Sequence, residues 1–468
     1  MTRSKAEGGT MTGRAVVWGL GRFGGGLAAF AHLRRCGYQV DVVDKRDAQE
    51  IRASLAESGI EAGSVELLAE APESFAGADL VVVNPAVHPE HPLYRHLINS
   101  GVELSQEIDL ALSAYPGEVV AVTGTNGKSS TSALLQQLLL ASGRDALLGG
   151  NIGRSLFEDR ESWHSEQIAV LEISSFQAFR LQLAPRLRAV LVTNLDEDHL
   201  DWHGSRDQYH AAKLRLSGAL QPGGRMLGHS SDPAWRQFCT SEGPGQCLLV
   251  GGAGQALRLD PDGAIRLEGK SILAADAPYP SAQPLRENAL LALAAAQELG
   301  CDISGLGESL AQFQGLEHRM QRLAPAQGVE FIDNGISTVA RSSEVAIDSY
   351  RSAPGLHWVV GGHPKRPELD EHIGIAASCS SVHIFGEVAE RLAPAMRAAH
   401  PQLMVTGPHP ELNSALVAAF KGAGPGEIVL FSPGFSSHDA YPNFAARAAE
   451  AREIWSALRS RTVGANVQ

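Results

Sequence analysis

The residues with the clearest chemical meaning lie at 123–129, where the sequence reads Thr-Gly-Thr-Asn-Gly-Lys-Ser. The apolar residues 119–122 predict a strand before them, and the Leu-, Gln- and Ala-rich stretch after them predicts a helix. Glycines free backbone N–H groups to surround phosphates at a helix N-terminus. Lys128 would neutralise the outer phosphates of a nucleoside triphosphate, and Ser129 would bind its Mg²⁺. The strict Walker pattern has glycine where this chain has Val122, so the loop is a variant, or else a tight turn beside a surface lysine.

A second glycine-rich turn lies near the N-terminus and has the spacing G-x-G-x-x-G, from Gly19 through Gly21 to Gly24. It separates an expected strand at 15–18 from an expected helix at 27–36, and Asp44 follows the next expected strand, 39–43. This arrangement is typical of sites that hold a nucleotide diphosphate at a helix N-terminus. The pattern leaves three interpretations open: an NAD site, a site for another nucleotide diphosphate, which we favour, and a structural turn.

Acidic residues follow two more expected strands in the middle of the chain. Glu172 ends the strand at 168–171, and the acidic run 194–201, which contains His199, follows the strand at 189–192. Ligands of such sheets bind beyond the carboxyl ends of the strands. A hard cation such as Mg²⁺ prefers oxygen ligands, with histidine joining occasionally. These residues therefore predict a metal site beside the phosphate loop, and the alternative is a solvated acidic loop.

The alternation of short apolar strands with helical stretches predicts an α/β fold throughout. At about 150 residues per domain, 468 residues correspond to about three domains. We expect an N-terminal domain at 1–116, a central domain at 117–317 and a C-terminal domain at 318–468. The region 222–284 is glycine-rich and less regular, and the helix at 286–299 belongs with the central domain. Strands of the last domain are expected at 329–332, 358–360, 382–385 and 428–431.

Charge and composition exclude several classes of partner. The 39 Lys and Arg residues against 52 Asp and Glu give a net charge of −13, which repels nucleic acid and anionic lipid at long range. No apolar run reaches the ~18 residues that span a bilayer, and the first dozen residues do not resemble a signal peptide. Five scattered cysteines without a C-x-x-C pair argue against a zinc or redox centre. We therefore expect a cytoplasmic protein that binds neither nucleic acid nor membranes.

In chain order, these motifs and several others resemble the Mur ligase family, the ATP-dependent enzymes that add amino acids to peptidoglycan precursors, and within it the glutamate-adding branch. The resemblance implies a three-domain Mur ligase architecture, with a Rossmann-like N-terminal domain, a central P-loop ATPase-like domain and a Rossmann-like C-terminal domain. The matching residues lie at 123–129, 149–153, 172–177, 194–201, 209, 211–213, 288, 318–319, 333 and 432–444. They cover all three expected domains.

The resemblance also implies the reaction and its partners. The enzyme would join glutamate to UDP-N-acetylmuramoyl-L-alanine in the cytoplasm, with ATP and Mg²⁺ and as a monomer. The carboxylate of the UDP-linked substrate would attack the γ-phosphate of ATP, and the amine of glutamate would then capture the acyl phosphate. Both steps spread negative charge that the protein must meet with cations.

The family's functional residues carry over onto this chain one position at a time. Lys213 matches a lysine that is carbamylated in the family and then supports a second Mg²⁺; its alternative is an exposed helix lysine. For Arg319 the alternative is a hinge arginine paired with an acid. The expected catalytic residues are Lys128, Glu172, His199 and Lys213, and the expected metal ligands are Ser129, Glu172, His199 and carbamylated Lys213. The expected ATP-binding residues are Gly124, Thr125, Asn126, Gly127, Lys128, Ser129, Ser130, Asn288, Arg319 and Asp333. The expected substrate-binding residues are Gly19, Gly21, Asn151, Lys365, Ser437 and Phe444.

Two stretches depart from the family pattern where glutamate should bind. Gly335 stands where glutamate-adding enzymes have a lysine, and residues 434–442 differ from the family's later motif. A missing cation weakens the binding of a dicarboxylate unless another group, such as Arg341 or Arg366, replaces it. We therefore favour L-glutamate as the acceptor, with inversion left to a separate downstream epimerase. D-Glutamate is the alternative, followed by another acceptor.

Three other classes explain fewer of the residues. A folylpolyglutamate-type ligase shares the ATP and metal machinery but generally lacks a separate nucleotide-binding N-terminal domain of this sort. An NAD-dependent oxidoreductase would use the turn at 19–24. It would leave four residues without a role: Lys128, Glu172, His199 and Lys213. A non-catalytic nucleotide-binding or scaffold protein would not need a phosphate loop together with metal-binding candidates.

Overall fold

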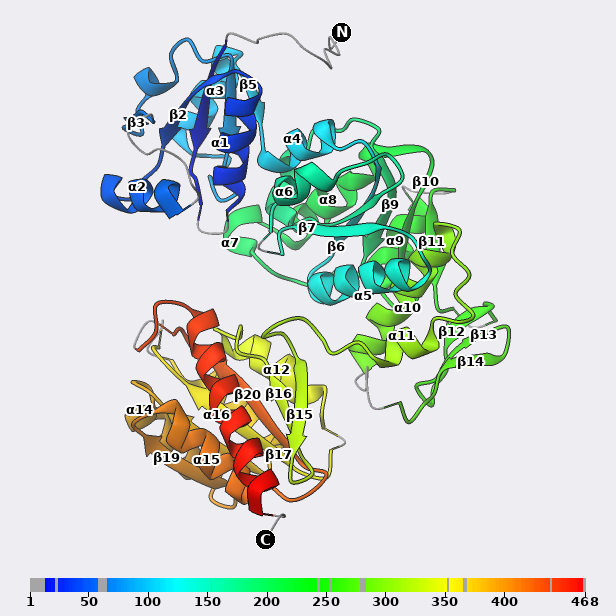
Figure 1. Cartoon of the computed structure of the whole chain (residues 1–468), viewed down its shortest axis with the longest axis vertical. Coiled ribbons are helices and arrows are strands. Elements are labelled where there is room, and N and C mark those ends of the chain that lie inside the picture. Colours follow the sequence, from blue (N-terminus) through cyan, green and yellow to red (C-terminus); the bar gives the residue numbers. More distant parts are fainter. Residues whose placement is uncertain are drawn as a thin grey trace. The chain divides into compact units, whose positions relative to one another are not determined.

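The computed structural model describes residues 13–21, 24–57, 65–152, 154–241, 245–252, 254–277, 283–351, 353–364, 368–437 and 440–465. The chain forms two compact units, whose helices and strands are labelled in Figure 1. The first unit comprises Met1–Asp276 and Leu285–Ala311, and the second comprises Ala277–Pro284 and Gln312–Gln468. The described part of the first unit contains two separate parallel sheets and a small antiparallel sheet, and that of the second contains one mixed sheet.

The N-terminal sheet has five parallel strands in the order β3-β2-β1-β4-β5. Its central strands β1 and β4 are almost continuous apolar runs, as strands covered on both faces require. One face packs against Phe30 and Leu33 of α1, and the other packs against Leu93 and Leu97 of α3. The elements are β1 (Arg14–Trp18), α1 (Gly25–Arg35), β2 (Gln39–Val43), α2 (Ala48–Glu57), β3 (Leu67–Leu68), the 3-10 helix η2 (Pro72–Phe75), β4 (Leu80–Val83), α3 (Pro92–Ser100) and β5 (Glu103–Ser105).

The central sheet has six parallel strands in the order β11-β10-β9-β6-β8-β7, so β6 lies between β8 and β9. The strand preceding the phosphate loop is therefore flanked by the two strands that precede the acidic residues. The elements are α4 (Glu107–Ala114), β6 (Glu118–Thr123), α5 (Lys128–Ala141), β7 (Ala146–Gly150), η3 (Leu156–Ser162), β8 (Ile168–Glu172), α6 (Ser175–Arg180), β9 (Leu187–Val192), α7 (Leu200–His203), α8 (Arg206–Leu214), η4 (Arg215–Ala219), β10 (Leu220–His229), α9 (Pro233–Ser241), β11 (Cys247–Val250), α10 (Gln283–Glu298) and α11 (Gly307–Ala311).

The segment 222–284 is more regular than the sequence predicts. β10, α9 and β11 complete one edge of the central sheet. A small antiparallel sheet follows, made of β12 (Leu257–Leu259), β13 (Ile265–Leu267) and β14 (Lys270–Leu273). Pro222, Gly223 and Gly224 interrupt the apolar pattern of β10, and the pairing of β10 with β9 shifts register there. Because of this irregularity, the pattern of apolar residues alone does not predict the strand.

The sheet of the second unit has the order β15-β16-β20-β17-β18-β19, in which β15 is antiparallel and the other strands are parallel. Alternate residues point to opposite faces, so Trp358 packs with Met396 of α14 and Val359 packs with Leu416 of α15. The elements are β15 (Gln321–Ala326), β16 (Val329–Asp333), α12 (Ala340–Asp348), β17 (Leu356–Gly361), α13 (Asp370–Ile375), η5 (Ala376–Ser378), β18 (Ser381–Phe385), α14 (Ala389–Ala399), β19 (Met404–His409), α15 (Leu412–Gly422), β20 (Ile428–Gly434) and α16 (Phe444–Ala465).

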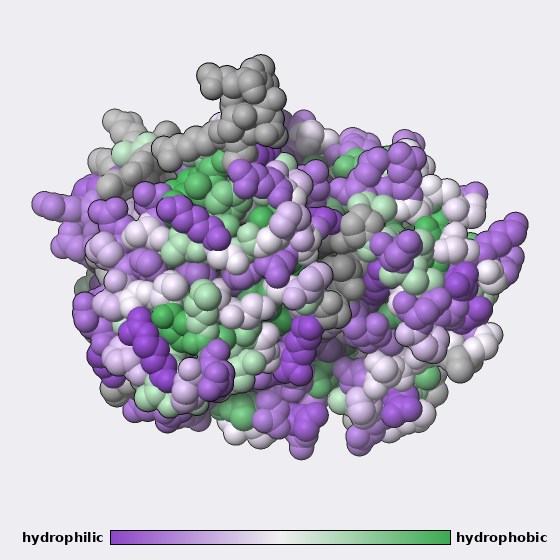
Figure 2. All heavy atoms as spheres, turned by 90° about the horizontal axis from the view of Figure 1, so that it is seen from below, coloured by the Kyte–Doolittle hydropathy of each residue, from purple (hydrophilic) through white to green (hydrophobic). Residues whose placement is uncertain are grey.

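Among the described residues, no helix has the length and apolarity needed to cross a bilayer. On the face drawn in Figure 2, hydrophilic side chains predominate and hydrophobic ones form small separate patches.

Candidate active site

Several of the predicted chemical groups of the first unit lie at the carboxyl ends of the central strands. β6 ends at Thr123 and leads into the phosphate loop, β8 ends at Glu172, and β9 ends just before Thr193 and Asn194. The three strands are parallel neighbours, so these residues lie at one edge of the sheet. This is the position at which open α/β sheets bind ligands.

The glycines of the phosphate loop have conformations that a side chain would disfavour. Gly124 has φ 138° and Gly127 has φ 77°, and Gly127 is the N-cap of α5. A Cβ on Gly124 would lie 1.9 Å from Thr193 Oγ1, so the loop passes too close to β9 for any other residue. Ser130 is half-buried in the first turn of α5. The sequence therefore folds into a turn that directs a helix N-terminus outward, as predicted.

The loop is fastened to the strand beside it by reciprocal hydrogen bonds. The N–H of Asn126 donates to Asn194 Oδ1 at 3.0 Å, and Asn194 Nδ2 donates to the Asn126 carbonyl at 3.0 Å. Thr193 Oγ1 donates to the same carbonyl at 2.5 Å, and the Thr125 hydroxyl bonds to the backbone of Asp196. Lys128 Nζ donates to the Thr125 carbonyl at 2.8 Å. The loop is thus preorganised by the end of β9.

Glu172 connects two other predicted residues of the site. Ser129 Oγ donates to Glu172 Oε2 at 2.5 Å, and Asn151 Nδ2 donates to Glu172 Oε1 at 2.9 Å. The Glu172 side chain is almost fully buried, with 1% of the residue exposed. Hydroxyl and carboxylate oxygens next to a phosphate loop form a donor set that suits Mg²⁺. The structure thus brings together three of the residues singled out from the sequence.

Lys213 is buried beneath the phosphate loop, so the alternative of an exposed helix lysine is wrong. Only 1% of the residue is exposed, its Nζ donates to the Gly124 carbonyl at 2.7 Å, and it lies 4.4 Å from the centre of the Tyr209 ring. Burial, and secondarily the charge of Lys128, lowers the pKa of Lys213 well below its ordinary value. A larger fraction of the amine is therefore neutral and nucleophilic.

His199 lies outside this contact cluster. It has φ 50°, its side chain is largely exposed, and its Nε2 lies 3.5 Å from Asp198. Its ring packs 4.8 Å from the Phe176 ring. Across the described residues, no three His, Cys, Asp or Glu side chains form a ready metal-binding group. The predicted ligands Glu172 and His199 are therefore not assembled with a third such side chain.

Asn288 reaches the phosphate loop from α10. A Cβ on Gly127 would lie 2.6 Å from Asn288 Oδ1, so the amide lies directly against the N-cap of α5. The helix that carries Asn288 belongs to the first unit, as the sequence predicts for 286–299. The amide is thus placed beside the point where α5 presents its N-terminus.

The N-terminal glycine turn is fixed by the end of β4 and by Asp44. Asn84 Nδ2 donates to the Gly19 carbonyl at 3.2 Å, and a Cβ on Gly19 or Gly21 would lie 2.9 Å from the Asn84 side chain. Asp44 Oδ2 accepts a 2.9 Å bond from the Leu20 N–H, and the carboxylate also binds Arg46. Asp44 therefore holds the turn in place.

Two predicted site residues of the second unit, Arg319 and Asp333, lie beside the paired strands β15 and β16. Asp333 is fully buried, and its Oδ2 accepts bonds from His318 Nδ1 at 2.8 Å and lies 3.2 Å from Arg452 Nε. Its Oδ1 accepts a 2.9 Å bond from the Gly335 N–H. Arg319 is half-buried, and its N–H donates to the Leu316 carbonyl at 3.0 Å. Asp333 thus accepts two hydrogen bonds and forms an ion pair with Arg452.

Gly335 occupies a position with no room for a side chain. A Cβ there would lie 2.4 Å from the Cβ of Ala448 on α16 and 3.0 Å from Asp333 Oδ1. The lysine that the family pattern places here is therefore excluded by packing, since Ala448 would have to move. Of the remaining predicted residues, Ser437 is buried beyond β20, Phe444 is half-buried at the start of α16, and Lys365 lies outside the described residues.

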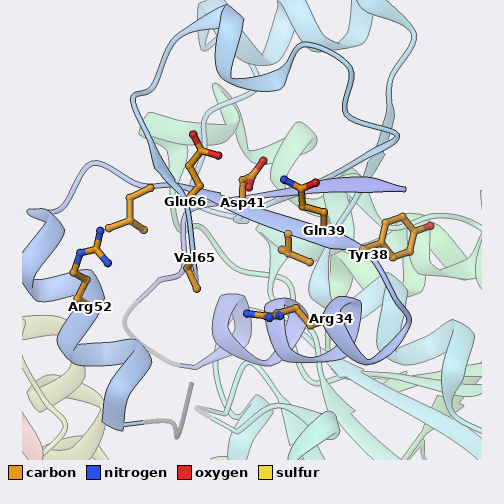
Figure 3. Close-up of a pocket in the computed structure, with 9 residues that line it drawn as sticks. Arg34, Tyr38, Gln39, Asp41, Arg52, Val65 and Glu66 are labelled. Carbon is orange, nitrogen blue, oxygen red and sulfur yellow. The ribbon is translucent and has the colours of Figure 1, made fainter. Parts of the chain in front are cut away.

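A separate pocket lies in the N-terminal sheet region. Its volume is about 570 Å³, and Figure 3 shows Arg34 and Arg52 on neighbouring helices and Glu66 at its rim. None of the residues predicted to bind a ligand lines it. Its lining combines charged and polar side chains with Val40, Val65 and Leu67, and includes none of the residues around Glu172.

The sequence patterns did not single out three residues that the structure places at functional positions: Thr193, Asn84 and Arg447. Thr193 and Asn84 each directly follow a buried strand, and a polar residue at that position is the signal that could have identified them. Arg447 is fully buried, and the signal that could have identified it is an arginine flanked on both sides by pairs of alanines in an expected helix.

Known proteins resemble this chain over most of its length. Residues 13–106 match the N-terminal domain of MurD-like Mur ligases, and residues 122–272 match the Mur ligase middle domain. A protein from Rubrobacter xylanophilus named UDP-N-acetylmuramoylalanine–D-glutamate ligase is 31% identical over 93% of this chain and 96% of its own length. The protein of the same name from Novosphingobium aromaticivorans is 33% identical over 95% of both chains. The crystal structure of MurF ligase from Thermotoga maritima in complex with ADP shares the fold, with a TM-score of 0.58, 17% identity and 96% coverage of both chains.

Proposed function

This chain belongs to the Mur ligase family of ATP-dependent, ADP-forming ligases, and on that basis we propose that it joins glutamate to UDP-N-acetylmuramoyl-L-alanine. The observation that carries the proposal is the cluster around Glu172, which joins Ser129 of the phosphate loop to Asn151. The names of the curated relatives support the choice of both substrates. The reaction would contribute to the synthesis of peptidoglycan precursors.

The proposed reaction has two steps. The carboxylate of the UDP-linked substrate attacks the γ-phosphorus of ATP, and ADP leaves. The amine of glutamate then attacks the acyl carbon, an amide forms, and phosphate leaves as the amine loses a proton. Lys128 and the N-terminus of α5 would stabilise the charge on the phosphate oxygens. Asn288, Arg319 and Asp333 are proposed to hold the adenine side, the γ-phosphate and the ribose.

We propose that Mg²⁺ accompanies ATP at this site. Ser129 and Glu172 would hold it, because their oxygens lie together beside the phosphate loop. Bound Mg²⁺ would neutralise charge on the phosphates during transfer. His199 is proposed to bind a second ion, together with Lys213 after carbamylation. That modification suits Lys213, because a buried lysine of lowered pKa presents a neutral amine to CO₂.

The proposal also includes the chirality of the glutamate that the enzyme adds. The departures at Gly335 favoured L-glutamate, but the relatives that match over most of the chain are named for D-glutamate, and we propose D-glutamate as the acceptor. One observation keeps L-glutamate as a second candidate: position 335 is closed against Ala448, so glutamate must meet its cations elsewhere. A downstream epimerase would be needed only for L-glutamate.

The division of labour among domains is also proposed. Residues 1–116 would hold the UDP-linked substrate through Gly19 and Gly21, residues 117–317 would activate ATP, and residues 318–468 would hold glutamate through Lys365, Ser437 and Phe444. The protein would act as a monomer in the cytoplasm. Isothermal titration with ATP, the UDP-linked substrate and NAD tests this assignment. Binding of the first two is expected, whereas tight binding of NAD alone would favour an oxidoreductase.

A further inference from the structure

Arg447 is a fully buried arginine whose guanidinium joins three loops of the second unit. It lies in α16, and no part of the residue is exposed. Its Nη1 donates to the carbonyls of Phe435 at 3.0 Å, Ser436 at 3.1 Å and Gly361 at 3.4 Å. Its Nη2 donates to the carbonyl of Ser337 at 3.3 Å. One side chain thus binds the backbone beyond β16, β17 and β20.

Two of these loops carry residues proposed to hold glutamate, and the third contains Gly335, where the lysine of the family pattern is missing. Gly361 ends β17, shortly before Lys365, and Ser436 directly precedes Ser437. Ser337 lies in the stretch that begins at Asp333 and contains the departure at Gly335. The carboxyl ends of neighbouring parallel strands meet at one edge of the sheet, where α/β folds bind ligands. Arg447 therefore contacts the backbone at each of the three strand ends that we take as this proposed site.

We propose that Arg447 is a positioning residue that sets the geometry of the acceptor amino-acid site and therefore the affinity for an α-amino dicarboxylate. The inference rests on the proposed function, because it takes the loops beyond β16, β17 and β20 as that site. Arg447 acts through the loops and does not itself touch the reacting atoms.

The packing around the guanidinium is close enough to transmit a displacement. A Cβ on Gly362, which has φ 133°, would lie 2.8 Å from Arg447 Nη1 and 2.3 Å from the Ser436 carbonyl oxygen. The N–H of His363 donates to the Ser436 carbonyl at 2.8 Å, and the Ser436 N–H donates to the His363 carbonyl at 3.1 Å. The loops beyond β17 and β20 are thus paired, and the arginine is bonded to both.

An arginine suits this task better than an apolar side chain or a lysine. Burying a cation is costly, and apolar residues of similar volume often stabilise a protein more than buried charges do. The planar guanidinium presents five N–H donors in fixed directions, whereas an ammonium group presents three from one point. A lysine at 447 can therefore satisfy some of the carbonyls but cannot hold all three loops in the same relative positions.

The experiment uses the full-length enzyme and the variants Arg447→Lys and Arg447→Met. Arg397→Met is the matched control, because Arg397 also donates to backbone carbonyls, those of Val405 and Gly407, but at β19 and away from the three loops. For each protein, KM is measured for glutamate, ATP and the UDP-linked substrate, together with kcat and the thermal unfolding midpoint. Titration with ATP reports separately on the phosphate loop of the first unit.

We expect Arg447→Met to raise KM for glutamate on the order of 10- to 100-fold, since small displacements of a positioned group have effects of that size. Arg447→Lys should raise KM for glutamate less. In both variants KM for ATP should change less than about 2-fold, since a tenfold change would correspond to 1.4 kcal/mol. The control should match the wild type. Equal rises in all three KM values, no change, or unfolding of both Arg447 variants would overturn the proposal. A wild-type enzyme that adds no glutamate would instead refute the proposed function.

Discussion

Ser129 Oγ and Glu172 Oε2 lie 2.5 Å apart, in a hydrogen bond that joins the first turn of α5 to the end of β8. The two residues are 43 positions apart in the chain. The parallel pairing of β6 and β8 brings them together, because the residue at the end of each strand reaches the same edge of the sheet. This bond joins the two residues proposed to hold Mg²⁺, and the proposed chemistry depends on their proximity.

Replacement of Lys128 tests the phosphate loop. Lys128→Ala removes a cation that donates to a carbonyl of the loop and should lower kcat/KM for ATP about 100-fold or more, as losses of single charge-stabilising groups do. Lys421→Ala, which changes an exposed lysine of α15, is the control and should keep wild-type turnover. Initial rates of ADP release give both values. A fully active Lys128→Ala enzyme would refute the loop assignment.

Replacement of Glu172 tests the proposed cation ligand. Glu172→Gln keeps the size of the side chain but removes its charge, so the Mg²⁺ concentration that gives half-maximal rate should rise about 10-fold or more. The matched control is Glu166→Gln, since Glu166 is exposed before β8. Rates are measured over a Mg²⁺ series at saturating ATP. An unchanged Mg²⁺ dependence would exclude Glu172 as a ligand.

Lys213 provides a test that does not depend on rates alone. Burial lowers the pKa of the Lys213 amine, which favours its reaction with CO₂, so activity should rise with added bicarbonate. Lys213→Ala should lose activity about 100-fold, as is typical for loss of a single electrostatic group. The carbamate should be visible by ¹³C NMR after labelling with ¹³C-bicarbonate. A wild-type signal that persists in Lys213→Ala would place the modification elsewhere.

The pH dependence of stability has a predictable sign at Glu107. Burial raises the pKa of Glu107 to about 7 from an ordinary value of 4.5, with Glu158 and Asp109 adding to the shift and the Ser155 hydrogen bond opposing it. Between these two values the folded state binds more protons than the unfolded state, so stability falls as pH rises from about 4.5 to about 7. Above pH 7 the carboxylate is charged in both the folded and the unfolded state, and the full free-energy cost of burying it remains.

Glu107→Gln should therefore flatten the thermal unfolding midpoint across this pH window and raise it above pH 7. Glu73→Gln, at an exposed position, is the control. Midpoints are measured by scanning calorimetry at several pH values between 4 and 8. Parallel profiles for the wild type and both variants would show that Glu107 titrates normally.

Much of the site framework follows from local sequence. The strands at 39–43 and 80–83 were predicted with their observed bounds, and other predicted strands differ by one to three residues at their ends. These strands are short apolar runs followed by polar or glycine residues, so their pattern is unambiguous. The phosphate loop was found for the same reason, since its glycines stand between a strand and a helix.

The features that escaped prediction depend on residues distant in the chain. The burial of Lys213 follows from how α8 packs under the loop, and a helix pattern rich in polar residues gives no sign of it. The closure of position 335 depends on Ala448 of α16, and the role of Arg447 depends on three loops that meet only in the folded unit. Glu172 was predicted as a ligand, but its partnership with Asn151 requires the observed order of β7 and β8.

The most direct test of the account is ADP release by the purified full-length protein. The assay supplies ATP, Mg²⁺, UDP-N-acetylmuramoyl-L-alanine and either D- or L-glutamate, and mass spectrometry identifies the product. We predict ADP release that requires both the UDP-linked substrate and glutamate, with D-glutamate the better acceptor and a product heavier by one glutamyl residue. Preference for L-glutamate would support the ligase assignment but make L-glutamate, not D-glutamate, the acceptor. Absence of ADP release and of a glutamyl product with either enantiomer would contradict the account.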